Sequence, residues 1–188
     1  MVEPLLRATD LVAGYSAPVV GPLSFTIDAG EVVGLWGPNG SGKSTLLKAI
    51  AKAARVFSGR LNRRPGLALG WQLQQPVRLP EMPFSGWEYL RYAQAQHIPP
   101  PANLVDCLDW RLDTLSGGQF QLVAVWAILG SAAELVLLDE PTNNLDPDSE
   151  AILAEILRTQ QGRRAVLLVS HERAFMEAAC HRVLEISG

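Results

Sequence analysis

The chain has 188 residues, of which 48% are hydrophobic and 19% are charged, as expected for one soluble globular domain. Its net charge of −3 gives no electrostatic reason to expect nucleic acid as a direct ligand. No run approaches the ~18 apolar residues of a membrane span, and Cys107 and Cys180 fit a reduced cytosolic protein because they have neither disulfide-framework nor zinc-site spacing.

Strand-like apolar runs alternate with helical patterns along most of the chain. Strands are predicted at Leu5–Val12, Leu23–Ile27, Glu31–Trp36, Leu67–Leu73, Leu135–Asp139, Ala165–Ser170 and Arg182–Ile186. Helices are predicted at Lys43–Ala54, Gly86–Gln96, Gly117–Leu129, Asp148–Thr159 and Glu172–Ala179. The late alternation of helix and strand indicates an α/β fold with a largely parallel sheet, and the closely spaced early strands indicate an antiparallel β subdomain.

Residues 76–115 differ from the rest because they are rich in proline and contain no convincing strand. We expect a single domain over residues 1–188, with a small helical subdomain inserted at about residues 76–130. The arginines of the cluster Arg60-Arg63-Arg64 are interpreted as part of a solvated loop.

The most informative segment follows the apolar run at 32–36. It consists of Gly37, Pro38, Asn39, Gly40, Ser41, Gly42, Lys43, Ser44 and Thr45. A strand, a glycine-rich turn and a helix in this order form a phosphate-binding loop, in which backbone N–H groups and the helix dipole face the phosphates. Lys43 is expected to reach the β- and γ-phosphates and Ser44 to bind Mg²⁺, so the loop predicts a nucleoside triphosphate site.

Two further motifs carry chemistry. The aliphatic strand 135–138 ends in Asp139, expected to hold Mg²⁺, and Glu140, expected to act as general base toward the attacking water. Ser116, Gly117, Gly118 and Gln119 precede an apolar helix, where Ser116 caps the helix and the glycines leave its first N–H groups uncovered. The simpler alternatives are a solvated acidic turn and an ordinary helix cap.

Together these motifs make the chain resemble the nucleotide-binding subunits of ATP-binding cassette (ABC) transporters over nearly its whole length. Walker A is Gly37–Thr45, the signature is Leu115–Gln119, and Walker B is Leu135–Asp139 followed by Glu140. The resemblance implies a P-loop ATPase fold, ATP and Mg²⁺ as ligands, and a second cassette that pairs head to tail, most simply as a homodimer. It also implies a separate transmembrane permease, and hence a peripheral position on the cytoplasmic face of the cell membrane.

The resemblance assigns four single residues. Gln74 matches the glutamine that touches Mg²⁺ and the attacking water, and His171 matches the switch histidine near the γ-phosphate. Asp146 belongs to the D-loop, and Tyr15 occupies the position of the aromatic that stacks on adenine. From the residues alone, Asp146 could instead cap the next helix, His171 could be an ordinary first-turn histidine, and Tyr15 could be a packed strand-end aromatic. Gln72 and Gln75 compete with Gln74.

Several features depart from the family pattern. The interval from Gln74 to Ser116 is short, which predicts a reduced helical subdomain, and Leu122 and Ala127 replace basic residues. The chain also ends just after the last predicted strand, so we expect no C-terminal regulatory domain. The short passage from Gly59 to Gln74 is similar to that of zinc and manganese importer cassettes, which suggests a divalent metal as cargo.

Two other functions compete with an ATP-hydrolysing transport subunit. A soluble ABC protein that acts on ribosomes or DNA is disfavoured because such proteins join two cassettes by a basic linker, whereas this chain has one cassette and a net negative charge. A module that binds ATP without hydrolysis is disfavoured because Glu140 and His171 are both present.

Overall fold

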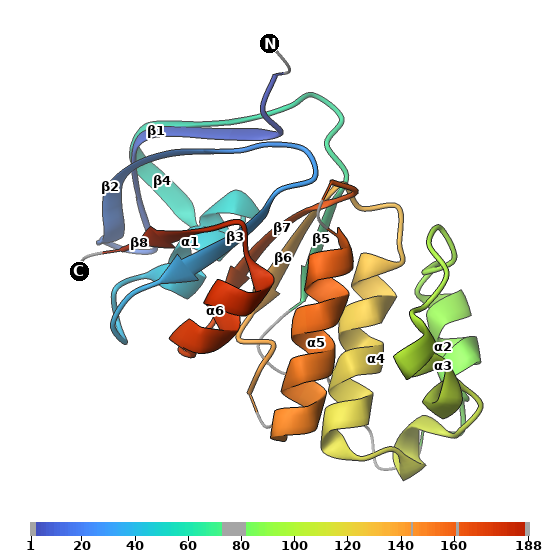
Figure 1. Ribbon diagram of the computed structural model, residues 1–188. Coiled ribbons are helices and arrows are strands. Elements are labelled where there is room, and N and C mark those ends of the chain that lie inside the picture. Colours follow the sequence, from blue (N-terminus) through green and yellow to red (C-terminus); the bar gives the residue numbers. More distant parts are fainter. Residues whose placement is uncertain (1–2, 73–81, 144, 161, 187–188) are drawn as a thin grey trace.

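A computed structural model describes residues 3–72, 82–143, 145–160 and 162–186 (Figure 1). The strands are β1 (Leu6–Gly14), β2 (Pro18–Ile27), β3 (Val32–Trp36), β4 (Arg55–Arg63), β5 (Leu69–Gln72), β6 (Leu135–Asp139), β7 (Ala165–Val169) and β8 (Arg182–Glu185). The helices are α1 (Lys43–Ile50), α2 (Gly86–Tyr92), α3 (Ala102–Leu108), α4 (Gly117–Leu129), α5 (Pro147–Gln160) and α6 (Arg173–Ala179), with a 3₁₀ turn at Leu112–Thr114. The predicted α/β class is confirmed.

The strands form two sheets with different hydrogen-bonding patterns. The five-stranded sheet has the order β5-β6-β7-β3-β8, and its neighbouring strands are parallel. The three-stranded sheet has the order β2-β1-β4 and is antiparallel. Both sheets had been predicted from the spacing of the strands and helices, because parallel strands require the intervening helices that β3, β6 and β7 have.

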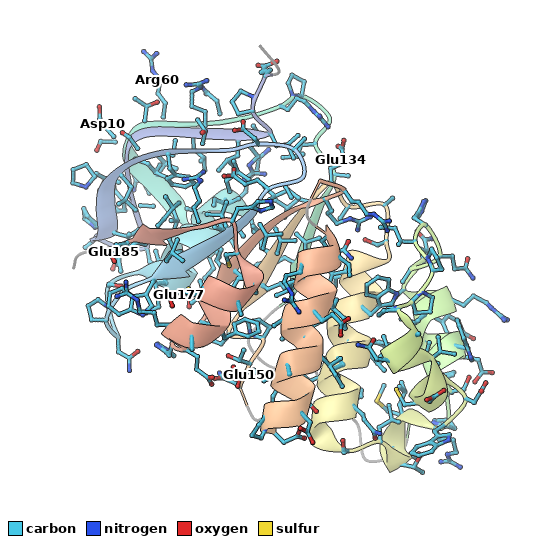
Figure 2. All side chains as sticks on the ribbon, viewed as in Figure 1. Asp10, Arg60, Glu134, Glu150, Glu177 and Glu185 are labelled. Carbon is cyan, nitrogen blue, oxygen red and sulfur yellow. The ribbon has the colours of Figure 1, made fainter. Side chains whose placement is uncertain are left out.

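Successive side chains of the parallel strands enter two different hydrophobic cores. In β6, Leu135 and Leu137 pack with α1 and the inner face of the antiparallel sheet, whereas Val136 and Leu138 pack with α4 and α5. All four side chains are fully buried. In Figure 1, α4, α5 and α6 lie on one side of the parallel sheet. The charged residues labelled in Figure 2, such as Glu134 and Glu177, lie at the outside of the molecule. The period of two along each strand therefore fixes the layers.

One strand was missed by the sequence analysis. The segment interpreted as a loop around Arg60 is the edge strand β4, which pairs with β1 over most of its length. Charged residues interrupt the expected alternation here, but an edge strand tolerates them because one of its sides faces solvent. Bulges between Thr9 and Val12 disturb the register further, next to the left-handed Asp10.

Two helices end earlier than their apolar patterns predict. Helix α1 ends at Ile50 rather than Ala54, and α2 ends at Tyr92 rather than Gln96. Each is followed two residues later by a residue in the left-handed region, Lys52 with φ 62° and Gln94 with φ 54°. Glycine or asparagine usually provides this stop, so neither end carried its usual sequence signal.

Helix α4 lies at the centre of the helical layer. Leu122 is 3% exposed and Ala127 is 5% exposed, so the two apolar departures from the family pattern are core residues in this chain. The helix contacts α2, α3, α5, β5 and β6, which explains why apolar side chains surround it. Among the described residues, no helix has both the length and the apolar character needed to cross a lipid bilayer.

The C-terminal end of α4 is held by Arg164, a buried arginine at the start of β7. Its guanidinium donates to the carbonyls of Ile128 at 3.3 Å and Ser131 at 2.7 Å. Burial lowers the pKa of Arg164, because desolvation disfavours the charged form. The two carbonyls compensate for that desolvation, as expected for a cation at a helix C-terminus.

We expect Arg164→Met to lower the free energy of unfolding by about 1–3 kcal/mol, because two partly buried carbonyls lose a charged donor. Arg163→Met is the matched control, since Arg163 is exposed, and should stay within about 0.5 kcal/mol of the wild type. Urea unfolding followed by circular dichroism measures both. Equal losses for the two variants would contradict an anchoring role for Arg164.

Candidate functional site

The site lies where the carboxyl ends of three parallel strands meet. The phosphate-binding loop follows β3, Asp139 ends β6 with Glu140 directly after it, and His171 follows β7. Because β7 pairs in parallel with both β3 and β6, these segments share one edge of the sheet. This is where ligands bind in open α/β sheets.

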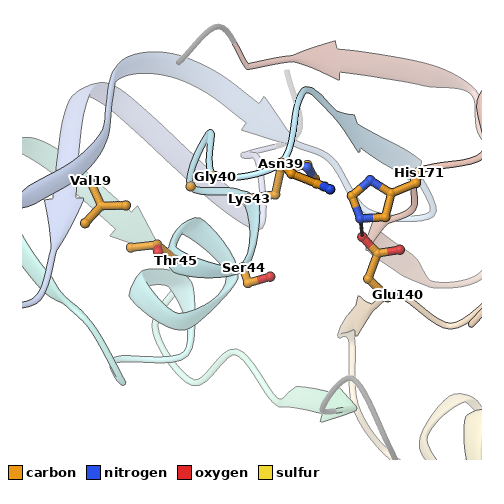
Figure 3. Close-up of a pocket in the computed structure, with 9 residues that line it drawn as sticks. Val19, Asn39, Gly40, Lys43, Ser44, Thr45, Glu140 and His171 are labelled. Atoms are coloured by element: carbon orange, nitrogen blue, oxygen red, sulfur yellow. Dashed lines mark ion pairs between the residues drawn. The ribbon is translucent and has the colours of Figure 1, made fainter.

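A cavity of about 330 Å³ opens at this edge (Figure 3). It is lined by Val19, Asn39, Gly40, Gly42, Lys43, Ser44, Thr45, Glu140 and His171. Loop residues and the two residues expected to act in hydrolysis therefore face the same space, although they come from three separate parts of the sequence.

Two glycines let the loop take its shape. Gly40 has φ 81° and Gly42 has φ 91°, a left-handed conformation that other residues adopt at a cost. A Cβ on Gly42 would lie 2.5 Å from Cβ of Val20, whereas one on Gly40 would meet no atom within 4 Å. Gly42 is therefore required by packing, and the backbone at Gly40 stays open to a ligand.

The lysine and serine of the loop are already engaged. Nζ of Lys43 donates to the carbonyl oxygens of Gly37 at 2.8 Å and Pro38 at 2.9 Å. Oγ of Ser44 donates to Oδ1 of Asp139 at 2.9 Å. The ammonium group is thus held beside the cavity, and Ser44 joins the loop to the end of β6.

Glu140 has a strained backbone and an incompletely satisfied side chain. Its φ is 53°, its side chain is buried, and its N–H donates to the carbonyl of Val169 at 3.0 Å. Nε2 of His171 lies 2.7 Å from its Oε1, whereas Oε2 has no hydrogen-bond partner within the part of the chain that the structure describes. Such strain is commonly found at functional sites.

Burial governs the protonation of both carboxyls. It raises the pKa of Glu140 above the ordinary value, and the neighbouring His171 opposes that rise. Burial also raises the pKa of Asp139, against the Ser44 hydrogen bond and the charge of Lys48. A carboxylate with a raised pKa is a better proton acceptor, which is what a general base requires.

The donor set suits a hard divalent cation. Ser44 and Asp139 offer oxygen atoms 2.9 Å apart, and the unpartnered Oε2 of Glu140 belongs to the adjoining residue. Oxygen ligands of this kind are the ones that Mg²⁺ takes, with substrate phosphates and water completing its shell. The residues present therefore fit this ion.

The signature segment lies apart from this cavity. Ser116 caps α4 through a reciprocal capping box, since its Oγ accepts from the N–H of Gln119 at 3.1 Å and its own N–H donates to Oε1 of Gln119 at 2.9 Å. A Cβ on Gly118 would lie 2.5 Å from Oγ of Ser149, whereas one on Gly117 would have open space. Gly118 is thus needed for packing, and Gly117 presents the helix end outward.

Asp146 lies beside the signature segment rather than beside the phosphate-binding loop. Its Oδ1 accepts from the N–H of Ser149 at 2.8 Å, and its Oδ2 accepts from Oγ of Ser149 at 3.1 Å. It therefore caps α5, the alternative left open by the sequence. These hydrogen bonds, led by the one from the N–H of Ser149, lower the pKa of the Asp146 carboxyl. Asp146, Ser116 and Gln119 all line a separate cavity of about 360 Å³.

Two predicted site residues remain to be placed. Tyr15 is 48% exposed just after β1, outside the cavity lining, and Nζ of Lys48 lies 5.6 Å from its ring centroid. Gln74 lies outside the described residues, as does its competitor Gln75. Gln72 is the buried last residue of β5, and its amide has no partner among the residues that are described.

Sequence reasoning missed several polar residues around the site. Gln121 donates through Nε2 to the carbonyl of Pro141 at 3.1 Å. The hydroxyls of Thr142 and Ser170 are 3.0 Å apart and tie the loop after β6 to the loop after β7. The one available signal was Gln121, a single polar side chain in the otherwise apolar run from 120 to 129.

Comparisons with known proteins agree with this geometry. The profile of the ABC transporter family matches residues 20–143. The zinc import ATP-binding protein ZnuC of Paracoccus denitrificans is 34% identical over 100% of this chain and 78% of its own length. The ZnuC of Cereibacter sphaeroides is 36% identical over 88% of this chain and 72% of its own length.

A solved structure agrees as well. The ATP-binding subunit of an ABC transporter superposes with a TM-score of 0.77 at 27% identity, over 97% of this chain and 85% of the other. The family match covers more than half of the chain, and it falls on the phosphate-binding loop, the signature helix and the Glu140 turn. The chain belongs to the ABC transporter family and is a transport-coupled ATPase of that family.

Proposed function

We propose that the chain is the ATP-hydrolysing subunit of a metal importer, and that it drives a separate permease by pairing with a second cassette. The observation that carries the proposal is the shared cavity, in which a phosphate-binding loop faces the Glu140–His171 pair.

ATP binding is assigned to the loop and the residues around it. Gly37 to Thr45 would surround the phosphates, with Lys43 moving from the carbonyls of Gly37 and Pro38 to the β- and γ-phosphates. Tyr15 would stack on the adenine, which its half-exposed ring allows. The movement of Lys43 exchanges two neutral acceptors for phosphate oxygens, which are stronger acceptors for an ammonium group.

Ser44, Asp139 and Gln74 are the proposed Mg²⁺ ligands, directly or through water. When bound, the ion would neutralise charge that develops on the phosphates. Ser44 and Asp139 would hold it at the mouth of the loop, where their oxygens already lie together.

Hydrolysis is assigned to Glu140, helped by His171, Gln74 and Lys43. Glu140 would take a proton from the attacking water, and His171 would orient its carboxylate through the 2.7 Å contact. Lys43 would stabilise charge on the γ-phosphate. The raised pKa of Glu140 makes it a stronger base than an exposed glutamate.

The signature segment is proposed to act on the ATP of a second chain. Ser116 and the N-terminal end of α4 lie at a separate cavity from the phosphate-binding loop, so they do not complete the chain's own site. Head-to-tail pairing would bring Ser116, Gly117, Gly118 and Gln119 to the partner's γ-phosphate, with Asp146 beside them. Binding would close the pair and hydrolysis would reopen it.

The permease and the cargo are inferred from the relatives. ZnuC proteins are named as zinc import ATP-binding proteins, and a zinc cargo agrees with the divalent metal suggested by the sequence. Zinc would be substrate of the permease, and this chain would sit against the cytoplasmic side of the membrane.

Glu140→Gln should lower kcat for ATP hydrolysis by about 10²- to 10⁴-fold, because it removes the general base while keeping the side-chain shape. The affinity for ATP should stay within about threefold, since the base is not needed for binding. Steady-state phosphate release and equilibrium nucleotide titration measure the two quantities. Unchanged turnover in Glu140→Gln would refute the mechanism.

Lys43→Ala and Gly117→Glu should each abolish turnover, and an equal mixture should recover part of it. In a mixed pair, the intact loop of one chain meets the intact signature of the other, so about one in four composite sites is whole after random exchange. Gly117 suits this test because its Cβ position is open and the variant should fold. No recovery in mixtures shown by mass spectrometry to contain mixed pairs would argue against composite sites.

Cells that carry Glu140→Gln in place of the wild-type chain should take up less zinc from zinc-depleted medium. Tagged wild-type chain recovered from solubilised membranes should bring a multi-span membrane protein with it. Uptake of radioactive zinc and mass spectrometry of the recovered proteins are the measurements. Recovery of ribosomal proteins alone, with normal zinc uptake, would favour the soluble ABC alternative.

A further inference from the structure

Gln121 is a buried polar residue that contacts the turn after the proposed base without lining its cavity. It is 8% exposed and occupies the apolar helix α4, where an amide is costly unless it is hydrogen-bonded. Its Nε2 donates to the carbonyl of Pro141 at 3.1 Å, and Pro141 directly follows Glu140. The hydrogen bond therefore joins the signature helix to the peptide beside Glu140.

The backbone at Glu140 needs such support. A non-glycine residue at φ 53° costs on the order of 1–3 kcal/mol and persists where its surroundings over-determine it. Here the N–H of Glu140 is held by Val169, and the carbonyl of Glu140 accepts from the N–H of Asn143 at 3.2 Å. Gln121, which lies on helix α4, donates a hydrogen bond to the next carbonyl, that of Pro141.

We propose that Gln121 is a positioning residue for Glu140, which rests on the proposed role of Glu140 as general base. Gln121 does not reach the reacting atoms, so it acts through Pro141 by keeping the strained turn in the conformation that points the carboxylate into the cavity.

The same hydrogen bond connects the helix that carries the signature segment with the turn that carries Glu140. Helix α4 begins at the Ser116 cap, which is proposed to meet a partner's ATP, and Gln121 lies little more than one turn further on. A shift of α4 on engagement of Ser116 is therefore transmitted to Glu140 in the chain's own site. Helix α4 also packs against β6, and the hydrogen bond from Gln121 adds a direct polar contact between α4 and the turn that follows β6.

The test compares Gln121→Met with Gln160→Met in the full chain. Methionine keeps the length of glutamine and removes the donor. Gln160 is the matched control because it is 1% exposed and ends α5, which runs from the Glu140 edge of the sheet back to the opposite edge. Gln121→Glu is a second variant that keeps the shape and replaces the donating nitrogen by oxygen.

We expect both Gln121 variants to lower kcat about tenfold to 10²-fold, with KM for ATP within about twofold of the wild type. Gln160→Met should leave kcat unchanged. Combined with Glu140→Gln, Gln121→Met should cause no further loss, because a residue that acts through Glu140 has nothing left to position.

Wild-type kcat in both Gln121 variants would overturn the proposal, as would an equal loss with and without the Glu140 carboxylate. A different result would show that the proposed function itself is wrong. In that case Glu140→Gln would retain wild-type turnover, both alone and combined with Gln121→Met. Single-turnover phosphate release measures the slow variants, and thermal unfolding with bound ATP verifies that each one folds.

Discussion

The parallel pairing of β7 with both β3 and β6 is the constraint on which the rest of the structure depends. It places the carboxyl ends of three strands at one edge, so the phosphate-binding loop, Glu140 and His171 converge although more than a hundred residues separate the first from the last. These three strands are buried on both faces, so their side chains pack alternately into two hydrophobic cores. Disrupting the packing of either core would therefore displace the strand ends that carry the site.

A second level of constraint acts on the short loops at that edge. Glu140 is strained, buried and paired with His171, and Thr142 and Ser170 join the loops that carry them. Polar groups buried in this way are costly when unpaired, so the network favours one arrangement of the loops. Within the described part of the chain, Oε2 of Glu140 is an exception because it has no hydrogen-bond partner, and Glu140 directly follows Asp139, one of the residues proposed to hold Mg²⁺.

The helical layer joins the site to the proposed partner chain. Helix α4 is anchored at its C-terminal end by Arg164 and near its N-terminal end by Gln121, so hydrogen bonds tie both ends of the helix to other parts of the chain. The apolar Leu122 and Ala127 fit this role, since both are buried in the helical layer. Their departure from the family pattern is thus accounted for by packing within the chain.

The sequence by itself determined the fold class, the phosphate-binding loop and the motif residues, because period-two runs and glycine spacing are local signals. It missed β4, whose charged edge residues lack that period, and the early ends of α1 and α2, which depend on left-handed residues without glycine.

Only the tertiary structure decided that Asp146 caps α5, that the signature lies away from the loop, and that Gln121 reaches Pro141. Each of these facts depends on which elements the sheet order and helix packing bring together, and local sequence patterns do not encode contacts between distant segments.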